Sequence, residues 1–90
     1  MRFVLTARDK AGHLQTRLDT RDAHVAWLKS SNCVEMAGPL LDTSGNMCGS
    51  LIVIDMPDLA AARAWAAQDP YAQAGLFNTV TLDPWKRVIG

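Results

Sequence analysis

The sequence has 90 residues, of which 49% are hydrophobic, and we expect it to form a single small domain over residues 1–90. Nine basic and nine acidic side chains cancel, which argues against the basic surface that binds nucleic acid or an anionic membrane. No apolar run reaches the ~18 residues of a membrane span, and the first residues do not resemble a secretory signal, so we expect a cytoplasmic protein.

The amino-terminal third predicts a strand and a helix that starts twice. Residues 1–8, MRFVLTAR, alternate in polarity and are rich in β-formers. After a turn, Leu14 and Leu18 lie four residues apart and predict a short helical segment. Asp19 is a good N-cap, so we expect a restart and a main helix over residues 20–31.

The middle of the chain predicts a β-hairpin. Its arms are residues 33–41 and 48–55, and Gly45 and Asn46 supply the turn chemistry between them. Pro39 indicates an irregular or edge position, because proline has no backbone N–H to donate to a neighbouring strand.

The two cysteines, Cys33 and Cys48, fall on opposite arms of this hairpin. Their places along the arms would separate them by on the order of 20 Å, which is beyond the reach of a disulfide. They also lack the spacing of zinc ligands. We therefore interpret both as reduced, structural cysteines, and we expect no metal site.

The last third predicts a helix, a second short helix and a strand. The first helix begins near Asp58 and is stopped by the Asp69-Pro70 pair. Asp69 then becomes the N-cap of a short helix that Gly75 closes. The final strand is expected within residues 78–89.

The resulting order, β-α-β-β-α-β, is the ferredoxin-like α+β pattern of a four-stranded antiparallel sheet with both helices on one face. The stretch Leu51–Ile54 is apolar at every position, although the uncovered face of such a sheet should carry polar residues. We expect a second copy to cover that face, giving a homodimer with a dimeric α/β barrel core. The alternative is a central strand whose outer face is merely apolar.

One histidine lies on the apolar side of the predicted main helix. Arg21, His24, Val25 and Leu28 are spaced to share one helix face. A buried arginine and imidazole need polar partners, so this face should border a polar pocket or an ion pair. His24 is either a hydrogen-bonded structural residue or a proton-transfer group, since an imidazole titrates near neutral pH.

Three carboxylates are candidate partners for His24: Asp42 at the hairpin mouth, Asp55 at a strand end and Asp69 at a helix cap. Each also has an ordinary structural explanation. Asp69 stands out because Tyr71 beside it brings an ionisable hydroxyl, and because helix-start N–H groups can hold an anion.

Ser50 follows a glycine but does not lie in a nucleophile motif, and we interpret it as a hydrogen-bonding residue of the pocket wall. His13, beside Gly12, is expected in solvent.

Four segments, in this order and spacing, resemble the YCII-related (YciI-like) family and together cover nearly the whole chain: TRLDTRDAHVAWL, MAGPLLD, CGSLIVID and AARAWAAQDPYAQAGLFNTVTLDPWKRV. The Arg-x-x-His of the helix and the Trp-x-x-x-Asp-Pro-Tyr run are the most specific parts. The hairpin loop is shorter here than in the family's better-known members.

The resemblance implies a ferredoxin-like fold in a dimeric α/β barrel, with a pocket in which a histidine and an aspartate form a proposed catalytic dyad. By motif position these residues are His24 and Asp69. A relative that acts on a chlorinated hydroxyhydroquinone suggests dehydrochlorination or a similar proton transfer on a small cyclic compound.

Two functions follow as hypotheses. The first is an enzyme of the lyase, dehydrochlorinase or isomerase type, without metal or organic cofactor, in which His24 moves a proton and Asp69 orients it. Arg17 or Arg21 would attract an anionic or phenolic group, while Ser50, Tyr71 and Asp42 would complete the pocket. The second is a dimeric module that binds a small molecule without converting it.

Overall fold

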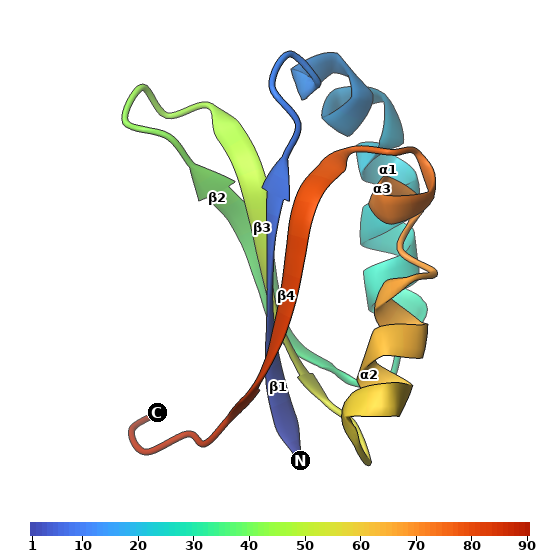
Figure 1. Ribbon diagram of the computed structural model, residues 1–90, viewed down its shortest axis with the longest axis vertical. Helices are drawn as coiled ribbons and strands as arrows, with labels where there is room; N and C mark the ends of the chain where they lie inside the picture. The colour runs from blue at the N-terminus through green and yellow to red at the C-terminus, as the bar shows by residue number, and fades with distance from the viewer.

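The computed structural model describes residues 1–90. Its elements in chain order are β1 (Arg2–Asp9), α1 (Leu14–Ser30), β2 (Val34–Leu41), β3 (Met47–Asp55), α2 (Leu59–Ala66), α3 (Pro70–Gln73) and β4 (Phe77–Trp85). The strands form one antiparallel sheet in the order β2-β3-β1-β4. All three helices lie over one face of it (Figure 1). The predicted ferredoxin-like α+β fold is confirmed.

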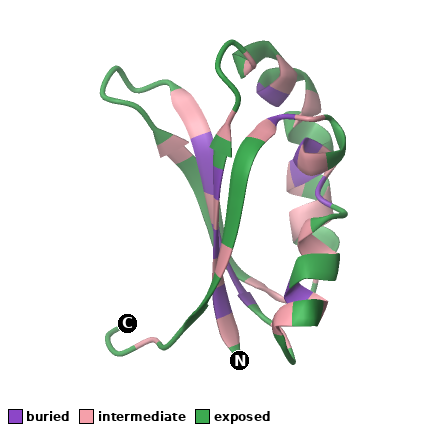
Figure 2. Ribbon diagram, in the orientation of Figure 1, coloured by how far each residue is buried: buried purple, intermediate pink, exposed green.

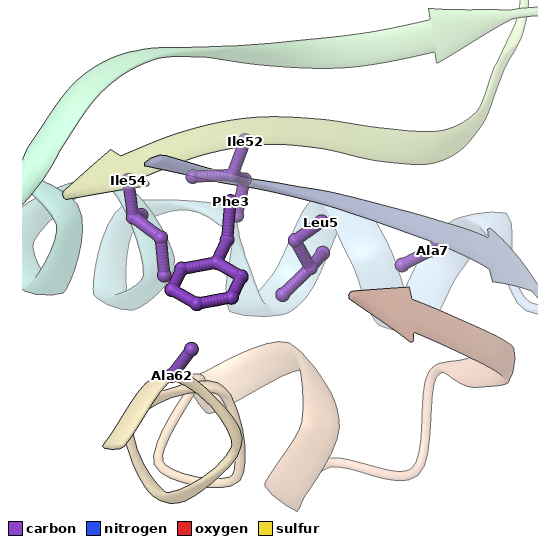
Figure 3. Packing of buried hydrophobic residues seen from close by; sticks show 6 residues of the cluster. All are labelled: Phe3, Leu5, Ala7, Ile52, Ile54 and Ala62. Atoms are coloured by element: carbon purple, nitrogen blue, oxygen red, sulfur yellow. The ribbon is translucent and has the colours of Figure 1, made fainter. Parts of the chain in front are cut away.

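The core lies between this sheet and the helices. Register places Phe3 opposite Ile54 and Leu5 opposite Ile52, so the alternate residues of β1 and β3 share one face. Figure 3 shows these side chains together, with the ring of Phe3 directed toward Ala62 of α2. All of these side chains are buried, so the hydrophobic effect pins α2 to the central strands.

The opposite face of the sheet carries no helix (Figures 1 and 2). Three of its central residues are nevertheless apolar, namely Val4, its partner Val53 and Leu51, whereas Thr6 opposite Leu51 is polar. Val53 is already buried by its neighbours on the sheet, at 3% exposed. Met36 on the neighbouring β2 is 51% exposed. As the sequence predicts, Leu51–Ile54 of β3 presents apolar side chains to both faces of the sheet.

Helix α1 is continuous, so the predicted restart is wrong. The carboxylate of Asp19 accepts a hydrogen bond from the Gln15 side chain within the helix instead of capping a new one. No glycine or proline interrupts residues 14–30, and an aspartate inside a helix costs well under 1 kcal/mol. Leu14 and Leu18 are both substantially exposed, and the buried residues of α1 are Arg17 and His24.

The helices of the last third begin as predicted. Asp58 caps α2 by accepting a hydrogen bond from the Ala61 N–H, and Asp69 caps α3 by accepting one from the Tyr71 N–H. Gly75 follows α3 with a φ of 74°, a left-handed conformation that glycine adopts without strain. The chain is thereby turned sharply from α3 into β4.

The sheet edges are also explained by sequence. Pro39 lies in β2, which is an edge strand. The final strand ends at Trp85, earlier than predicted, and residues 86–90 belong to no element.

Both cysteines are free. None of the helices combines the length and apolar character needed to cross a membrane.

Candidate active site

A cavity of about 180 Å³ opens between α1, α3 and the strands β2 and β3. Its apolar wall includes Val25 and Leu28 of α1 and Pro39 of β2. Five polar side chains also line it: Arg17, Arg21, His24, Ser50 and Tyr71. A small apolar space with a few converging polar groups is the usual form of a small-molecule site.

The side chains of His24 and Asp69 form a buried hydrogen bond. The distance between His24 Nδ1 and Asp69 Oδ1 is 2.7 Å, and the two side chains are only 8% and 2% exposed. The partner is thus Asp69, and neither of the other two candidate carboxylates. Because the contact uses Nδ1, the Nε2 atom of His24 is the ring nitrogen without a hydrogen-bond partner in the protein, and the residue lines the cavity.

The start of α3 fixes the carboxylate of Asp69. Its Oδ1 atom accepts the Tyr71 N–H at 2.9 Å in addition to the His24 contact. Its Oδ2 atom is buried and has no hydrogen-bond partner. The carboxylate is therefore held in place by two contacts of one oxygen, the Tyr71 N–H and the His24 ring.

Tyr71 joins the dyad to the cations of the cavity wall. Its ring stacks on His24 with centroids 3.9 Å apart, and the guanidinium of Arg17 lies 4.6 Å from the same ring centroid. Burial raises the pKa of the Tyr71 hydroxyl, while the charges of Arg17 and Arg21 act in the opposite direction. The phenol therefore stays neutral at physiological pH and can donate a hydrogen bond.

Arg17 is held by a buried ion pair with Asp9. Arg17 Nε and Nη2 donate to the two carboxylate oxygens at 2.7 and 2.9 Å, and Nη2 also donates to Ser50 Oγ at 2.9 Å. Burial acts to lower the pKa of Arg17, but the hydrogen bond and charge of Asp9 outweigh it, and the pKa is raised. Arg17 is thus a fixed cation whose charge is already compensated.

Asp9 is the site residue that sequence reasoning missed, because it looked like an ordinary turn aspartate. It lies where the pairing of β1 with β4 shifts register, between Arg8 and Asp9. The signal that could have revealed it is Arg17 itself, since a buried arginine requires a carboxylate.

The other predicted residues are distributed differently. Arg21 lines the cavity from the exposed side of α1 and forms no ion pair. Asp42 does not line this cavity. Its carboxylate accepts the N–H groups of Ser44 and Asn46 and stabilises the hairpin turn. Asp55 is exposed and pairs with the amino terminus.

Removing Asp9 should destabilise the protein strongly, because Arg17 would remain buried without its counter-ion. We expect Asp9→Ala to lower the free energy of unfolding by about 3–5 kcal/mol. The exposed Asp19→Ala should change it by less than about 0.5 kcal/mol. Urea denaturation followed by circular dichroism checks both, and equal effects would refute the importance of the buried pair.

The titration of Tyr71 should show its burial directly, because it is the single tyrosine in the chain. We expect its pKa in the folded protein to exceed the value of about 10 found in the unfolded chain. The folded state then holds this proton more tightly, so stability should fall as the pH rises above about 10. Ultraviolet absorbance of tyrosinate, with and without urea, measures both titrations; coincident curves would contradict the prediction.

Comparison with known proteins agrees with this architecture. Protein YciI of Escherichia coli O6:H1 is 36% identical over 97 residues, covering 98% of this chain and 99% of that protein. The structure of a 5-chloro-2-hydroxyhydroquinone dehydrochlorinase from Burkholderia phenoliruptrix AC1100 has a TM-score of 0.89 at 28% identity, covering 96% of this chain and 94% of that one. The cofactor-independent oxygenase SnoaB from Streptomyces nogalater shares the fold alone, with a TM-score of 0.61 at 17% identity and coverages of 98% and 94%. Because the YCII-related domain also matches residues 1–86, this chain belongs to the YCII-related family.

Proposed function

We propose that this protein is a small cytoplasmic enzyme that moves a proton on a small, cyclic metabolite by general acid/base catalysis, without a metal or organic cofactor. The observation that carries the proposal is the buried 2.7 Å contact between His24 Nδ1 and Asp69 Oδ1, with His24 lining a cavity. The carboxylate holds the neutral imidazole with its proton on Nδ1, which leaves the lone pair of Nε2 available as a base.

The proposed step begins when Nε2 removes a proton from a carbon of the bound ring. The electrons of the broken C–H bond form a new double bond. Either chloride or another leaving group departs from the neighbouring carbon with its bonding electrons, or the electrons of an adjacent C=O or C=C bond shift to its far atom, which then takes the proton back from Nε2. The first course is an elimination and the second an isomerisation. In both, Asp69 stabilises the imidazolium that forms, because its carboxylate is buried beside that charge.

The cavity favours a small ring that carries an oxygen substituent. Tyr71 and Ser50 offer hydroxyl groups, Arg21 offers an uncompensated charge, and Val25, Leu28 and Pro39 supply apolar surface. The dehydrochlorinase from Burkholderia phenoliruptrix, which is similar over nearly its whole length, was solved in complex with 2,5-dihydroxybenzoquinone. That similarity makes hydroxylated and chlorinated quinones and hydroquinones the first compounds to test.

Substituting His24 separates catalysis from mere binding. We expect His24→Gln to lower kcat by about 10²–10⁴-fold on a substrate found in such a panel, because a positioned acid/base contributes that much. His13→Gln is the matched control, since His13 is the other histidine in the chain, lies outside the cavity, and its side chain hydrogen-bonds only to the Ala11 carbonyl. Unchanged turnover in His24→Gln would refute His24 as the acid/base. Binding of these compounds by the wild type with no turnover of any of them would instead support the second candidate function, a module that binds its ligand without converting it.

A measurement that needs no substrate tests the geometry of the dyad. Nitrogen-15 NMR reports which ring nitrogen of a neutral histidine carries the proton. We expect Nδ1–H for His24, and loss of this preference in Asp69→Asn. An Nε2–H tautomer in the wild type would refute the dyad.

We also propose that two copies pack through their uncovered sheet faces. The support is the apolar character of Val4, Leu51 and Val53 on a face that no helix covers. Burying such a face removes apolar surface from water, whereas a charge at its centre would have to be desolvated.

Leu51→Lys should therefore convert the protein to a monomer. Light scattering after size-exclusion chromatography measures the mass, and Val88→Lys in the exposed C-terminal tail is the control that should remain dimeric. A monomeric wild-type protein would refute the proposed dimer.

A further inference from the structure

The hydroxyl group of Ser50 is set by the protein to donate a hydrogen bond into the cavity of the candidate site. A serine hydroxyl has one hydrogen to donate and two lone pairs that accept. Arg17 Nη2 donates to Ser50 Oγ at 2.9 Å, and a guanidinium has no lone pair with which to accept a hydrogen bond in return. The Ser50 hydroxyl forms no other hydrogen bond within the protein, so its hydrogen has no protein acceptor.

This donor is buried, and a buried donor without an acceptor is unfavourable. Ser50 is 2% exposed and lines the cavity. The hydrogen bond from the Arg17 guanidinium also polarises the hydroxyl and makes it a better donor. A ligand atom that lies against Ser50 should therefore be an oxygen that accepts.

The position of the hydroxyl is fixed by the sheet and by the buried ion pair. Ser50 lies on β3 and pairs with Ala7 of β1. A β-carbon on the preceding Gly49 would lie 2.4 Å from the Ala7 carbonyl oxygen, so the two strands approach more closely there than a side chain at this position would allow. From the helix side, Arg17 is held by both carboxylate oxygens of Asp9. The donor is thus in place before a ligand arrives, as charge stabilisation requires.

The same cavity holds the complementary group. In the proposed tautomer of His24 the proton is on Nδ1, which leaves a lone pair on Nε2. His24 and Ser50 both line the cavity, one from α1 and the other from β3. A carbonyl compound with a hydrogen on the neighbouring carbon uses both groups, because removal of that hydrogen places negative charge on the carbonyl oxygen.

We propose that Ser50 binds the carbonyl oxygen of the substrate and stabilises the negative charge that develops on it. The inference rests on the proposed function, because it takes His24 as the base. Nε2 removes a proton from the carbon beside the carbonyl, the C–H electrons form a C=C bond, and the π electrons of the C=O bond move to the oxygen. The enolate oxygen accepts the Ser50 hydrogen bond until carbon regains a proton from Nε2. The substrate class is a small ring ketone with a C–H group next to its carbonyl.

Infrared spectroscopy tests the assignment without turnover. The probe is 2-cyclohexen-1-one labelled with carbon-13 at the carbonyl, whose stretching frequency falls when its oxygen accepts a hydrogen bond. We expect the bound probe to absorb at lower frequency in the wild type than in Ser50→Ala. Ser44→Ala, at an exposed turn outside the cavity, is the matched control and should keep the wild-type frequency. The Arg17–Asp9 ion pair remains in Ser50→Ala, so this variant should fold, which circular dichroism checks.

Hydrogen exchange measures the contribution of Ser50 to proton transfer. In D₂O the wild type should replace the hydrogens on C6 of unlabelled 2-cyclohexen-1-one faster than buffer alone does, as followed by proton NMR. We expect Ser50→Ala to lower the protein-catalysed rate by about 10²–10³-fold, the effect of removing one oxyanion donor. Ser44→Ala should leave the rate unchanged.

Several results would overturn the assignment of Ser50. Equal carbonyl frequencies in the wild type and Ser50→Ala would do so, as would an unchanged exchange rate or a wild type that neither binds nor exchanges the ketone. A frequency shift that disappears in Tyr71→Phe but persists in Ser50→Ala would assign the donor to the other hydroxyl of the cavity.

His24→Gln separates this inference from the proposed function, because it should lose the exchange and keep the frequency shift. If His24→Gln loses the exchange while Ser50→Ala retains it, the base stands and the assignment of Ser50 fails. If the frequency shift depends on Ser50 while His24→Gln exchanges as fast as the wild type, Ser50 binds the carbonyl and the catalytic proposal for His24 fails.

Discussion

The hydrogen bond between His24 and Asp69 ties the middle of α1 to the start of α3, two segments 45 residues apart. One carboxylate oxygen serves two structures, because it also caps α3 through the Tyr71 N–H. The hydrogen bond of the cap fixes the position of the carboxylate. The carboxylate in turn fixes the orientation of the imidazole ring through Nδ1, which leaves Nε2 without a partner in the protein. The position of the proposed base therefore depends on the local geometry of a four-residue helix.

The polar cavity is tolerated inside a small protein because its buried ionisable groups are paired, while Arg21, which has no ion pair, is exposed. Arg17 has Asp9 and Ser50, and His24 has Asp69. Breaking either pair would leave a buried group without its partner, which costs far more than the pair itself contributes to stability. The apolar core of Phe3, Leu5, Ile52 and Ile54 lies along the same face of the sheet and supplies the hydrophobic stabilisation on which this polar end relies.

Sequence reasoning reached the order of the elements, the caps at Asp58 and Asp69, and the face on which His24 lies, because each has a local cause in turn, cap or periodicity. It failed in two places. Asp19 has the residue type of a helix cap, but no glycine or proline ends the helix before it, so α1 runs through. Asp42 was expected to border the pocket and Asp9 was not. Only the folded chain shows that Asp9 pairs with Arg17 and that Asp42 accepts a hydrogen bond within its own turn.

The continuity of α1 has a consequence for the shape of the compounds that the protein could select. Arg21 and His24 sit on the same unbroken helix, three residues apart, and an α-helix advances by about 1.5 Å per residue. Their spacing is therefore set by backbone geometry and not by the motion of a loop. If the proposed function holds, a substrate would carry its charged substituent and its reacting atom at a matching interval, so discrimination would fall on the substitution pattern of the ring more than on its overall bulk.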